Sequence, residues 1–207
     1  VKGGSVYKIE NDTVTLFGAI PDGTSLVTFA ANETQVAICD VLAVYVKTGA
    51  GAFSEIPATV FTGAATIAQL DSRLILSEVA SDRFFVFFPN DFTQIGALDF
   101  ASAESSPDKI IRAFVDHREI WLLGSSTTEI WNNQGGTDFP FARFGGAAME
   151  RGCIAPHSVA AEDNSVFWLG NDGFLYRADG YRPQRISTEA IERIVASASD
   201  PSLAYGF

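Results

Sequence analysis

A short phrase of apolar residues, an aromatic ring and a turn rich in Asn, Asp and Gly recurs along this chain. One copy is Val86-Phe87-Phe88 before Asn90-Asp91, and another is Leu175-Tyr176 before Asp179-Gly180. The aromatic residues stand 38, 42, 44 and 45 positions apart, at Tyr7, Tyr45, Phe87, Trp131 and Tyr176. A period of about 40 to 50 residues that carries several strands indicates a β-propeller or a related β-array.

Each repeat contains three further apolar runs. A polar residue followed by three apolar residues precedes the aromatic run, at residues 35–38, 73–76, 119–122 and 165–168. A first run is expected at residues 26–29, 66–70, 110–115 and 158–161, and a last run at residues 53–56, 92–95, 139–144 and 183–186. Four strands joined by short hairpins form a propeller blade. The sequence therefore predicts a single all-β domain over 1–207, an array of four-stranded antiparallel blades.

The two ends of the chain depart from this pattern. Residues 6–9 and 14–17 match the third and fourth strands of a blade, so the chain is expected to open inside one and to be a fragment of a longer protein. Leu203-Ala204-Tyr205 is interpreted as the first strand of another blade. Ser187-Thr188-Glu189 before residues 190–195 predicts one short capped helix near the C-terminus. The resulting count, about four and a half blades, does not close a ring neatly.

The charge balance excludes one class of partner. Lys and Arg number 14 against 25 Asp and Glu, which gives a net charge of −11. Such a chain has no basic face that could neutralise phosphates, so tight direct binding of nucleic acid is not expected. No apolar stretch reaches the roughly 20 residues of a membrane helix, and no membrane span is predicted. Cys39 and Cys153 are expected to be two reduced, buried thiols.

No catalytic, cofactor-binding or metal-binding residue is assigned. His117 and His157 are one blade apart and are interpreted as solvated turn residues. Residues 124–128, Gly-Ser-Ser-Thr-Thr, lack both the Gly-x-Ser-x-Gly pattern and a P-loop lysine, and they predict a hairpin turn. A propeller can nevertheless gather acids from several blades in its central channel. A ligand-binding or hydrolytic propeller, acting on carbohydrate, therefore remains the alternative function.

The aromatic side chains admit two interpretations. They could form sugar-stacking platforms, or they could pack between blades, and their repeated placement at strand centres favours packing. The residues concerned are Trp121, Trp131, Trp168, Tyr176 and Tyr181. Tyr181 and Arg182 follow the Asp179-Gly180 turn and are expected to be the exposed exceptions.

Several ordered motifs go beyond propeller generality. Gly124-Ser125-Ser126-Thr127 is followed by Glu129-Ile130, then by Gly152-Cys153-Ile154, and then by the helix at residues 187–194. With residues 106–111 and 165–170, these motifs make the segment from about Ser102 to Val195 similar to the packaged-DNA stabilisation proteins of short-tailed temperate phages. Those proteins are the tail hubs beneath the portal. The first hundred residues match only as blades.

This resemblance implies a non-enzymatic virion component. It would be located in the virion tail, and in the host cytoplasm during assembly. It implies a ring-forming plug that joins the head-to-tail adaptor to the tail needle and tailspikes and retains packaged DNA, with no cofactor. Contacts with these partners are expected at exposed loops such as residues 135–138 and 145–152, with Met149 and Arg151 as candidate interaction residues beside Tyr181 and Arg182.

Overall fold

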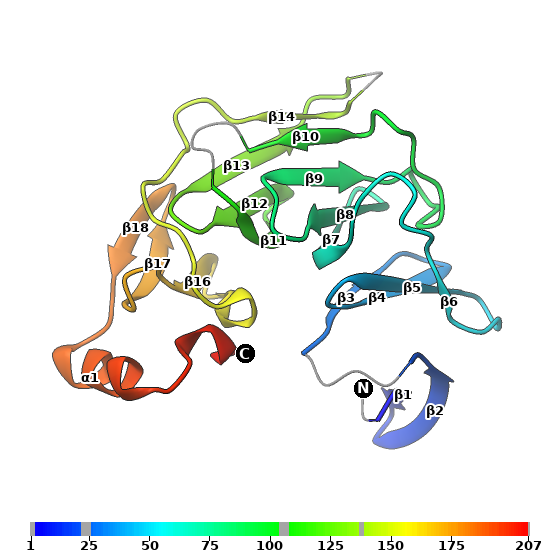
Figure 1. The fold of residues 1–207 in the computed structure, drawn as a ribbon, viewed down its shortest axis with the longest axis horizontal. Helices are drawn as coiled ribbons and strands as arrows, with labels where there is room; N and C mark the ends of the chain where they lie inside the picture. The colour runs from blue at the N-terminus through cyan, green and yellow to red at the C-terminus, as the bar shows by residue number, and fades with distance from the viewer. Residues whose placement is uncertain (1–2, 22–25, 104–107, 137–138, 207) are drawn as a thin grey trace.

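Four four-stranded antiparallel sheets and one two-stranded sheet form an open arc of blades in the computed structural model (Figure 1). The structure describes residues 3–21, 26–103, 108–136 and 139–206. The all-β propeller-type fold predicted from the repeat is confirmed, and it holds in detail for the strand count of each full blade.

The strands follow one another across each sheet. Blade 1 contains β3 (Thr28–Ala31), β4 (Gln35–Asp40), β5 (Ala43–Thr48) and β6 (Ser54–Glu55). Blade 2 contains β7 (Ala64–Leu70), β8 (Arg73–Glu78), β9 (Arg83–Val86) and β10 (Phe100–Ser102). Blade 3 contains β11 (Ile110–Asp116), β12 (Glu119–Gly124), β13 (Thr128–Asn133) and β14 (Phe141–Arg143). Blade 4 contains β15 (Ala160–Glu162), β16 (Ser165–Leu169), β17 (Leu175–Asp179) and β18 (Arg182–Arg185).

The remaining elements lie at the two ends of the arc. The half-blade is the hairpin of β1 (Ser5–Glu10) and β2 (Thr13–Ala19). After blade 4 come the helix α1 (Glu189–Ser197) and the 3-10 turn η2 (Pro201–Leu203), and a second 3-10 turn, η1 (Pro156–Ser158), precedes β15. Figure 1 shows α1 and the half-blade on opposite sides of the open part of the arc.

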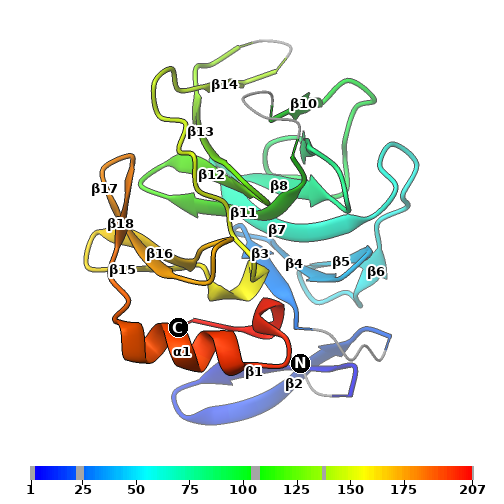
Figure 2. The same ribbon diagram turned by 60° about the vertical axis from the view of Figure 1, so that its left-hand side comes forward.

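The first strands of blades 1 to 3 lie nearest the axis. β3 contacts β7, and β7 contacts β11, so these three strands gather at the centre of the molecule (Figure 2). The short turn η1, which precedes the first strand of blade 4, also contacts β11. The axial region is therefore built from consecutive inner strands, as in a propeller.

The aromatic landmarks of the four full blades occupy equivalent third-strand positions and are buried, as predicted. Tyr45 lies in β5, Trp131 in β13 and Tyr176 in β17, with 8%, 9% and 6% of their surfaces exposed. Phe87 directly follows β9, and its N–H donates to the carbonyl of Leu74 at 2.9 Å, which continues the pairing with β8.

The core consists of layers between consecutive blades rather than one central mass. Phe84 and Phe85 are neighbours on β9, and both are fully buried. Because successive strand residues point to opposite faces, Phe84 packs toward blade 3, with its ring 5.0 Å from that of Trp131, while Phe85 packs toward blade 1. This double burial explains why the central strands are almost continuously apolar.

Two sequence predictions about elements are wrong. Residues 92–95 do not form the fourth strand of blade 2, a position that β10 occupies. Phe92 instead anchors a loop in the core between blades 1 and 2, where its N–H donates to Gln35 Oε1 at 2.7 Å. Leu203 ends a 3-10 turn rather than starting a strand, because Pro201 begins the turn and Asp200 accepts the N–H of Ser202 at 3.0 Å. The predicted helix is confirmed as α1, but its N-cap residue, Thr188, makes no side-chain capping hydrogen bond.

Candidate interaction surface

The loop at residues 145–152 is a structural insert rather than an open contact loop. Met149 has 2% of its surface exposed and packs in the core between blades 3 and 4. Its N–H donates to the carbonyl of Thr128 at 2.8 Å, and the Thr128 N–H donates back at 2.9 Å. The expectation that Met149 is exposed is therefore wrong. The free energy gained by burying the Met149 side chain in the core keeps it inside, although the neighbouring Gly and charged residues are typical of an exposed loop.

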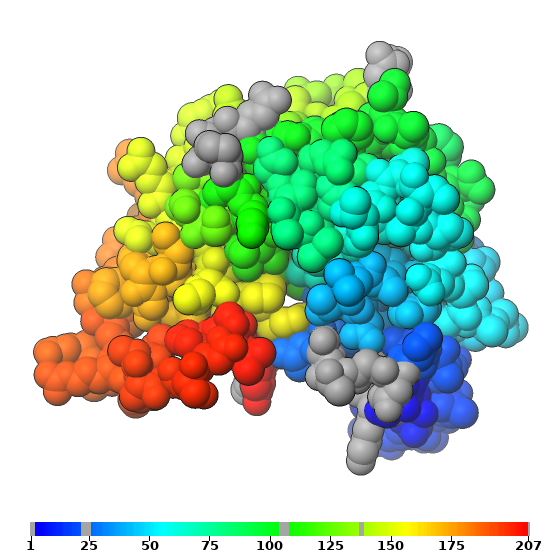
Figure 3. All heavy atoms as spheres, viewed as in Figure 1, coloured from blue at the N-terminus to red at the C-terminus, as the bar shows by residue number. Residues whose placement is uncertain are grey.

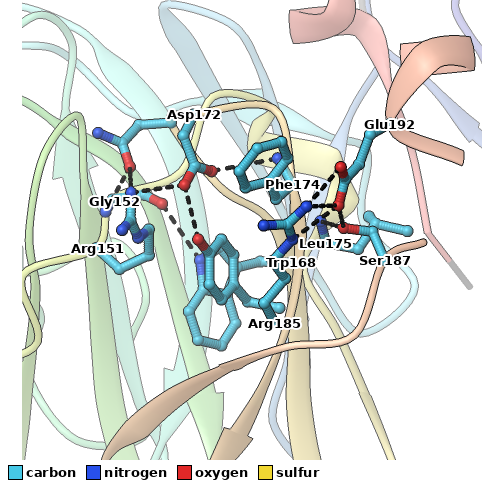
Figure 4. A network of polar contacts seen from close by, with 11 residues as sticks. Arg151, Gly152, Trp168, Asp172, Phe174, Leu175, Arg185, Ser187 and Glu192 are labelled. Atoms are coloured by element: carbon cyan, nitrogen blue, oxygen red, sulfur yellow. Dashed lines mark hydrogen bonds and ion pairs between the residues drawn. The ribbon is translucent and has the colours of Figure 1, made fainter. Parts of the chain in front are cut away.

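Arg151 holds this loop to the next blade. Its Nη1 lies 2.7 Å from Asp172 Oδ2, and its guanidinium lies 5.0 Å from the ring centre of Tyr176 (Figure 4). The Tyr176 hydroxyl donates to the same Asp172 at 2.6 Å. Burial first, and then this hydrogen bond, raise the pKa of Tyr176 to about 12. Only 30% of the Arg151 side chain is therefore exposed, and its charge is paired with Asp172 of the same chain.

The tryptophan beneath this ion pair serves packing, not sugar stacking. Trp168 is 1% exposed and stacks on Tyr176, with ring centres 5.7 Å apart. Its Nε1 donates to the Gly152 carbonyl at 3.2 Å, so the ring face packs on Tyr176 and the polar N–H is hydrogen-bonded (Figure 4). The interpretation of these two repeated aromatics as interblade core is confirmed.

A second polar cluster fastens α1 to blade 4. Arg185 lies over the Phe174 ring at 3.9 Å and donates two hydrogen bonds, of 2.7 and 2.6 Å, to Glu192 of the helix (Figure 4). The Ser187 hydroxyl donates to the same carboxylate at 2.8 Å and accepts the N–H of Leu175 at 3.2 Å. The carboxylate of Glu192 therefore ties the helix to the blade.

Tyr181 and Arg182 differ in exposure. The Tyr181 ring packs 6.4 Å from Trp121 and 5.3 Å from Phe144, and its hydroxyl donates to Glu119 at 2.5 Å. This hydrogen bond first, and then burial, raise the pKa of Tyr181 to about 12. Tyr181 is thus half-buried between blades 3 and 4, contrary to expectation, whereas Arg182 is exposed as expected.

A groove of about 240 Å³ lies beside Tyr181, between blades 3 and 4. Its wall includes Glu119 and the indole of Trp121, whose Nε1 is buried without a hydrogen-bond partner among the described residues. His117 bridges blades 3 and 4 at the edge of the groove: its Nδ1 lies 2.5 Å from Asp116, and its Nε2 lies 2.6 Å from Asn164 of blade 4. Of the polar and aromatic places in the structure, this groove fits best the alternative reading as a ligand-binding propeller.

The two histidines are expected to titrate on opposite sides of the ordinary value of 6.5. Hydrogen bonding to Asp116, and then to Asn164, raises the pKa of His117, whereas burial, and then the charge of Arg112, lower that of His157. The ring signals in a pH series of NMR spectra should therefore move separately, His157 losing its proton first as the pH rises. The pKa of His117 is higher in the folded state than in the unfolded state. The contacts of His117 with Asp116 and Asn164, here called its clamp, therefore stabilise the fold below the unfolded pKa, and this stabilisation is lost as pH rises through the folded pKa. Equal midpoints for the two rings would contradict the clamp.

No metal centre is found within the described ranges, which contain no cluster of three or more His, Cys, Asp or Glu side chains suited to an ion. Cys39 and Cys153 are free and buried, as expected. No helix of the described chain is both long and apolar enough to cross a membrane.

The half-blade presents an apolar face that the sequence reasoning did not single out. Tyr7 pairs with Leu16 and Ile9 pairs with Val14, so the four side chains share one face of the hairpin. They are 49%, 68%, 73% and 61% exposed, respectively. The opposite face carries Val6, which packs onto blade 1. The alternation of apolar residues at positions 7, 9, 14 and 16 was the available signal.

A second apolar surface lies at the other end of the arc. Ile194 on α1 is 70% exposed, and Leu203 and Tyr205 after it are 68% and 69% exposed. A cavity of about 340 Å³ beside them is lined largely by apolar residues of blade 4, including Phe167 and Ile186. Figure 3 shows the C-terminal region and the half-blade separated by a notch. We call the half-blade face and this surface the two open ends.

Solved structures similar to this chain support the fold. The extracellular domain of BT4673 from B. thetaiotaomicron is 11% identical, with a TM-score of 0.57, over 96% of this chain and 28% of that chain. PorZ, a surface component of the type-IX secretion system of Porphyromonas gingivalis, is 15% identical, with a TM-score of 0.53, over 89% of this chain and 26% of its own. The chain thus spans little more than a quarter of either protein. At these identities the likeness concerns the fold alone.

The chain has no match among curated proteins. A family model described as "Bacteriophage P22 Gp10, beta-propeller" does match, and it covers residues 1–206, including the first hundred residues that resembled the family only as blades. Repeated blades, interblade cores and this match agree, and the chain belongs to the phage stabilisation β-propeller family.

Proposed function

We propose that this protein is a structural part of a phage tail hub, which joins the head-to-tail adaptor to the distal tail and retains packaged DNA. The observation that carries the proposal is the family match over nearly the whole chain, which makes a phage structural protein the consistent reading. The hub position, the ring of copies, and the adaptor, needle and tailspike partners are part of the proposal.

The two open ends support a role in assembly. A contiguous exposed apolar patch is typical of a contact surface, such as one for another protein. Ile9 and Leu16 at one end, and Ile194 and Tyr205 at the other, are exposed despite strong hydrophobicity. Retention of DNA on this proposal is mechanical. A net charge of −11 disfavours tight binding to the DNA backbone and would let DNA pass without sticking.

The test is particle assembly with variants at the open ends. Ile9→Asp and Ile194→Asp, each in the full-length protein, are expected to leave thermal unfolding nearly unchanged, because both side chains are largely exposed. They should lower the yield of DNA-filled particles at least about tenfold if apolar burial holds the assembly together. Thr13→Asp, an exposed change on the same hairpin but outside the apolar face, is the matched control.

The ligand-binding alternative predicts another outcome. Normal assembly by both open-end variants, together with a measured sugar binding or hydrolysis that Glu119→Gln abolishes, would replace the structural proposal with a function in the groove beside Tyr181. Because Glu119 accepts the hydroxyl of Tyr181, the Tyr181→Phe variant separates loss of that hydrogen bond from loss of the carboxylate.

A further inference from the structure

A ladder of side chains runs across the inner strands, and one rung breaks it. Equivalent positions on successive blades are Thr28, Thr66, Arg112 and Ser158, at spacings of 38, 46 and 46 residues. The hydroxyl of Thr28 accepts the N–H of Ile67 on the next blade at 3.0 Å. The hydroxyl of Thr66 repeats this contact with Ala113 at 3.0 Å. Each of these threonines therefore joins its own blade to the following one.

Arg112 cannot continue the ladder. A guanidinium has five N–H donors and no acceptor, so it cannot accept an N–H from blade 4 as a threonine would. Its Nε and Nη1 are buried and lack hydrogen-bond partners among the described residues. The guanidinium carbon lies 5.9 Å from the ring centre of Phe114, which supplies no acceptor atom of its own. Unpaired donors on a buried cation are costly.

The groups around Arg112 leave its charge unbalanced. The titratable groups that interact with it electrostatically are the thiols of Cys39 and Cys153, from blade 1 and from the segment before blade 4, and the imidazole of His157, whose pKa the charge of Arg112 helps to lower. Burial raises the pKa of these thiols to about 12 and about 11, so they are neutral near pH 7. Burial also lowers the pKa of Arg112, but only to about 10, so the guanidinium stays charged.

We propose that Arg112 is an oxyanion-binding residue at the axis of the propeller, with the carboxylate or phosphate group as its ligand chemistry. N–H···O bonds to oxyanion oxygens from Nε and from Nη1, which point to different sides of the guanidinium, would satisfy the donors that the fold leaves open. Arg112 as a whole keeps part of its surface exposed, whereas Nε and Nη1 are buried, so an anion would have to reach these two nitrogens from the exposed part of the side chain. The proposal does not depend on the proposed role in the phage tail.

Inorganic phosphate is the first probe, added to the whole chain at constant ionic strength. Isothermal titration should show a saturable site in the wild type, and phosphate should raise the midpoint of thermal unfolding. Arg112→Thr restores the residue type of the other rungs and should fold, with phosphate affinity weakened at least about tenfold. Arg182→Thr removes the same charge at an exposed position and should bind phosphate like the wild type.

Further arms identify the source of the anion and guard against a folding defect. Acetate that competes with phosphate at this site would extend the ligand class to carboxylates, whereas phosphate binding without such competition would restrict it to phosphate. Arg112→Lys keeps the charge but loses the fork of donors, so it should bind phosphate more weakly than the wild type even if Arg112→Thr misfolds. Equal phosphate responses in the wild type and Arg112→Lys, or the absence of any phosphate or acetate response in the wild type, would overturn the proposal.

Discussion

Met149→Asp is expected to lower the free energy of unfolding by about 3 to 5 kcal/mol. The side chain is 2% exposed and lies in the apolar layer between blades 3 and 4, beside Trp121 and Trp168. A carboxylate there would lose its hydration without gaining an opposite charge, and the packing of the thioether would be lost as well. Urea unfolding followed by tryptophan fluorescence measures the change directly.

The matched control is Ala148→Asp, which adds the same charge one residue earlier at an exposed position. Its effect should remain within about 0.5 kcal/mol, the usual range for surface changes. Equal stability of the two variants would contradict the burial of Met149 and would return the loop to the candidate contact surfaces. A loss of assembly by Met149→Asp alone would report misfolding, not a lost partner contact.

Gly152→Ala is expected to cost about 3 kcal/mol, near the upper end of typical overpacking penalties. A Cβ at this position would lie 2.5 Å from the carbonyl carbon of Ser125, 2.5 Å from the Ser126 nitrogen and 2.6 Å from the Gly124 oxygen. These are backbone atoms of the β12–β13 turn, which cannot move aside as a flexible side chain would. The methyl group would therefore push the loop and the turn apart.

The displacement should spread through the hydrogen bonds of Gly152. Its carbonyl accepts the Trp168 indole N–H at 3.2 Å, and its N–H donates to Asn171 Oδ1 at 3.2 Å. Thermal unfolding together with the Trp fluorescence maximum would detect both losses. Gly145→Ala, where a Cβ would meet no atom within 4 Å, should leave stability unchanged or slightly raised. Equal stability of Gly152→Ala and Gly145→Ala would contradict the close packing of Gly152 against the β12–β13 turn.

The blade architecture was predictable because it follows from local rules. Residues 73–76 and 119–122 alternate with turns at fixed spacing, and each run needs only its hairpin neighbour to become a strand. Phe87 and Trp131 were placed correctly for the same reason, since their equivalence depends on the period and not on distant contacts. The helix α1 was likewise evident from its Ser-Thr-Glu start.

Exposure of individual side chains was not predictable, because it depends on neighbours that are distant in sequence. Met149 sits in a Gly-rich loop typical of a surface, yet blade 4 covers it. Tyr181 follows a turn, yet Glu119, 62 positions earlier, holds its hydroxyl. Phe92 begins an apolar run that suggested a strand, but its ring is buried in the core between blades 1 and 2. Tertiary packing overrides local pattern at such positions.

The sequence by itself determined the repeat, the all-β class, the acidic net charge and the likeness to the phage family, because period, composition and motif order are properties of the linear chain. Only the tertiary structure decided which surfaces are open. Tyr7 and Tyr45 occupy the same place in their repeats, yet Tyr7 is 49% exposed and Tyr45 only 8%. The physical reason is that a blade face is buried only when another blade packs against it, and the outer face of the half-blade has no such neighbour among the described residues.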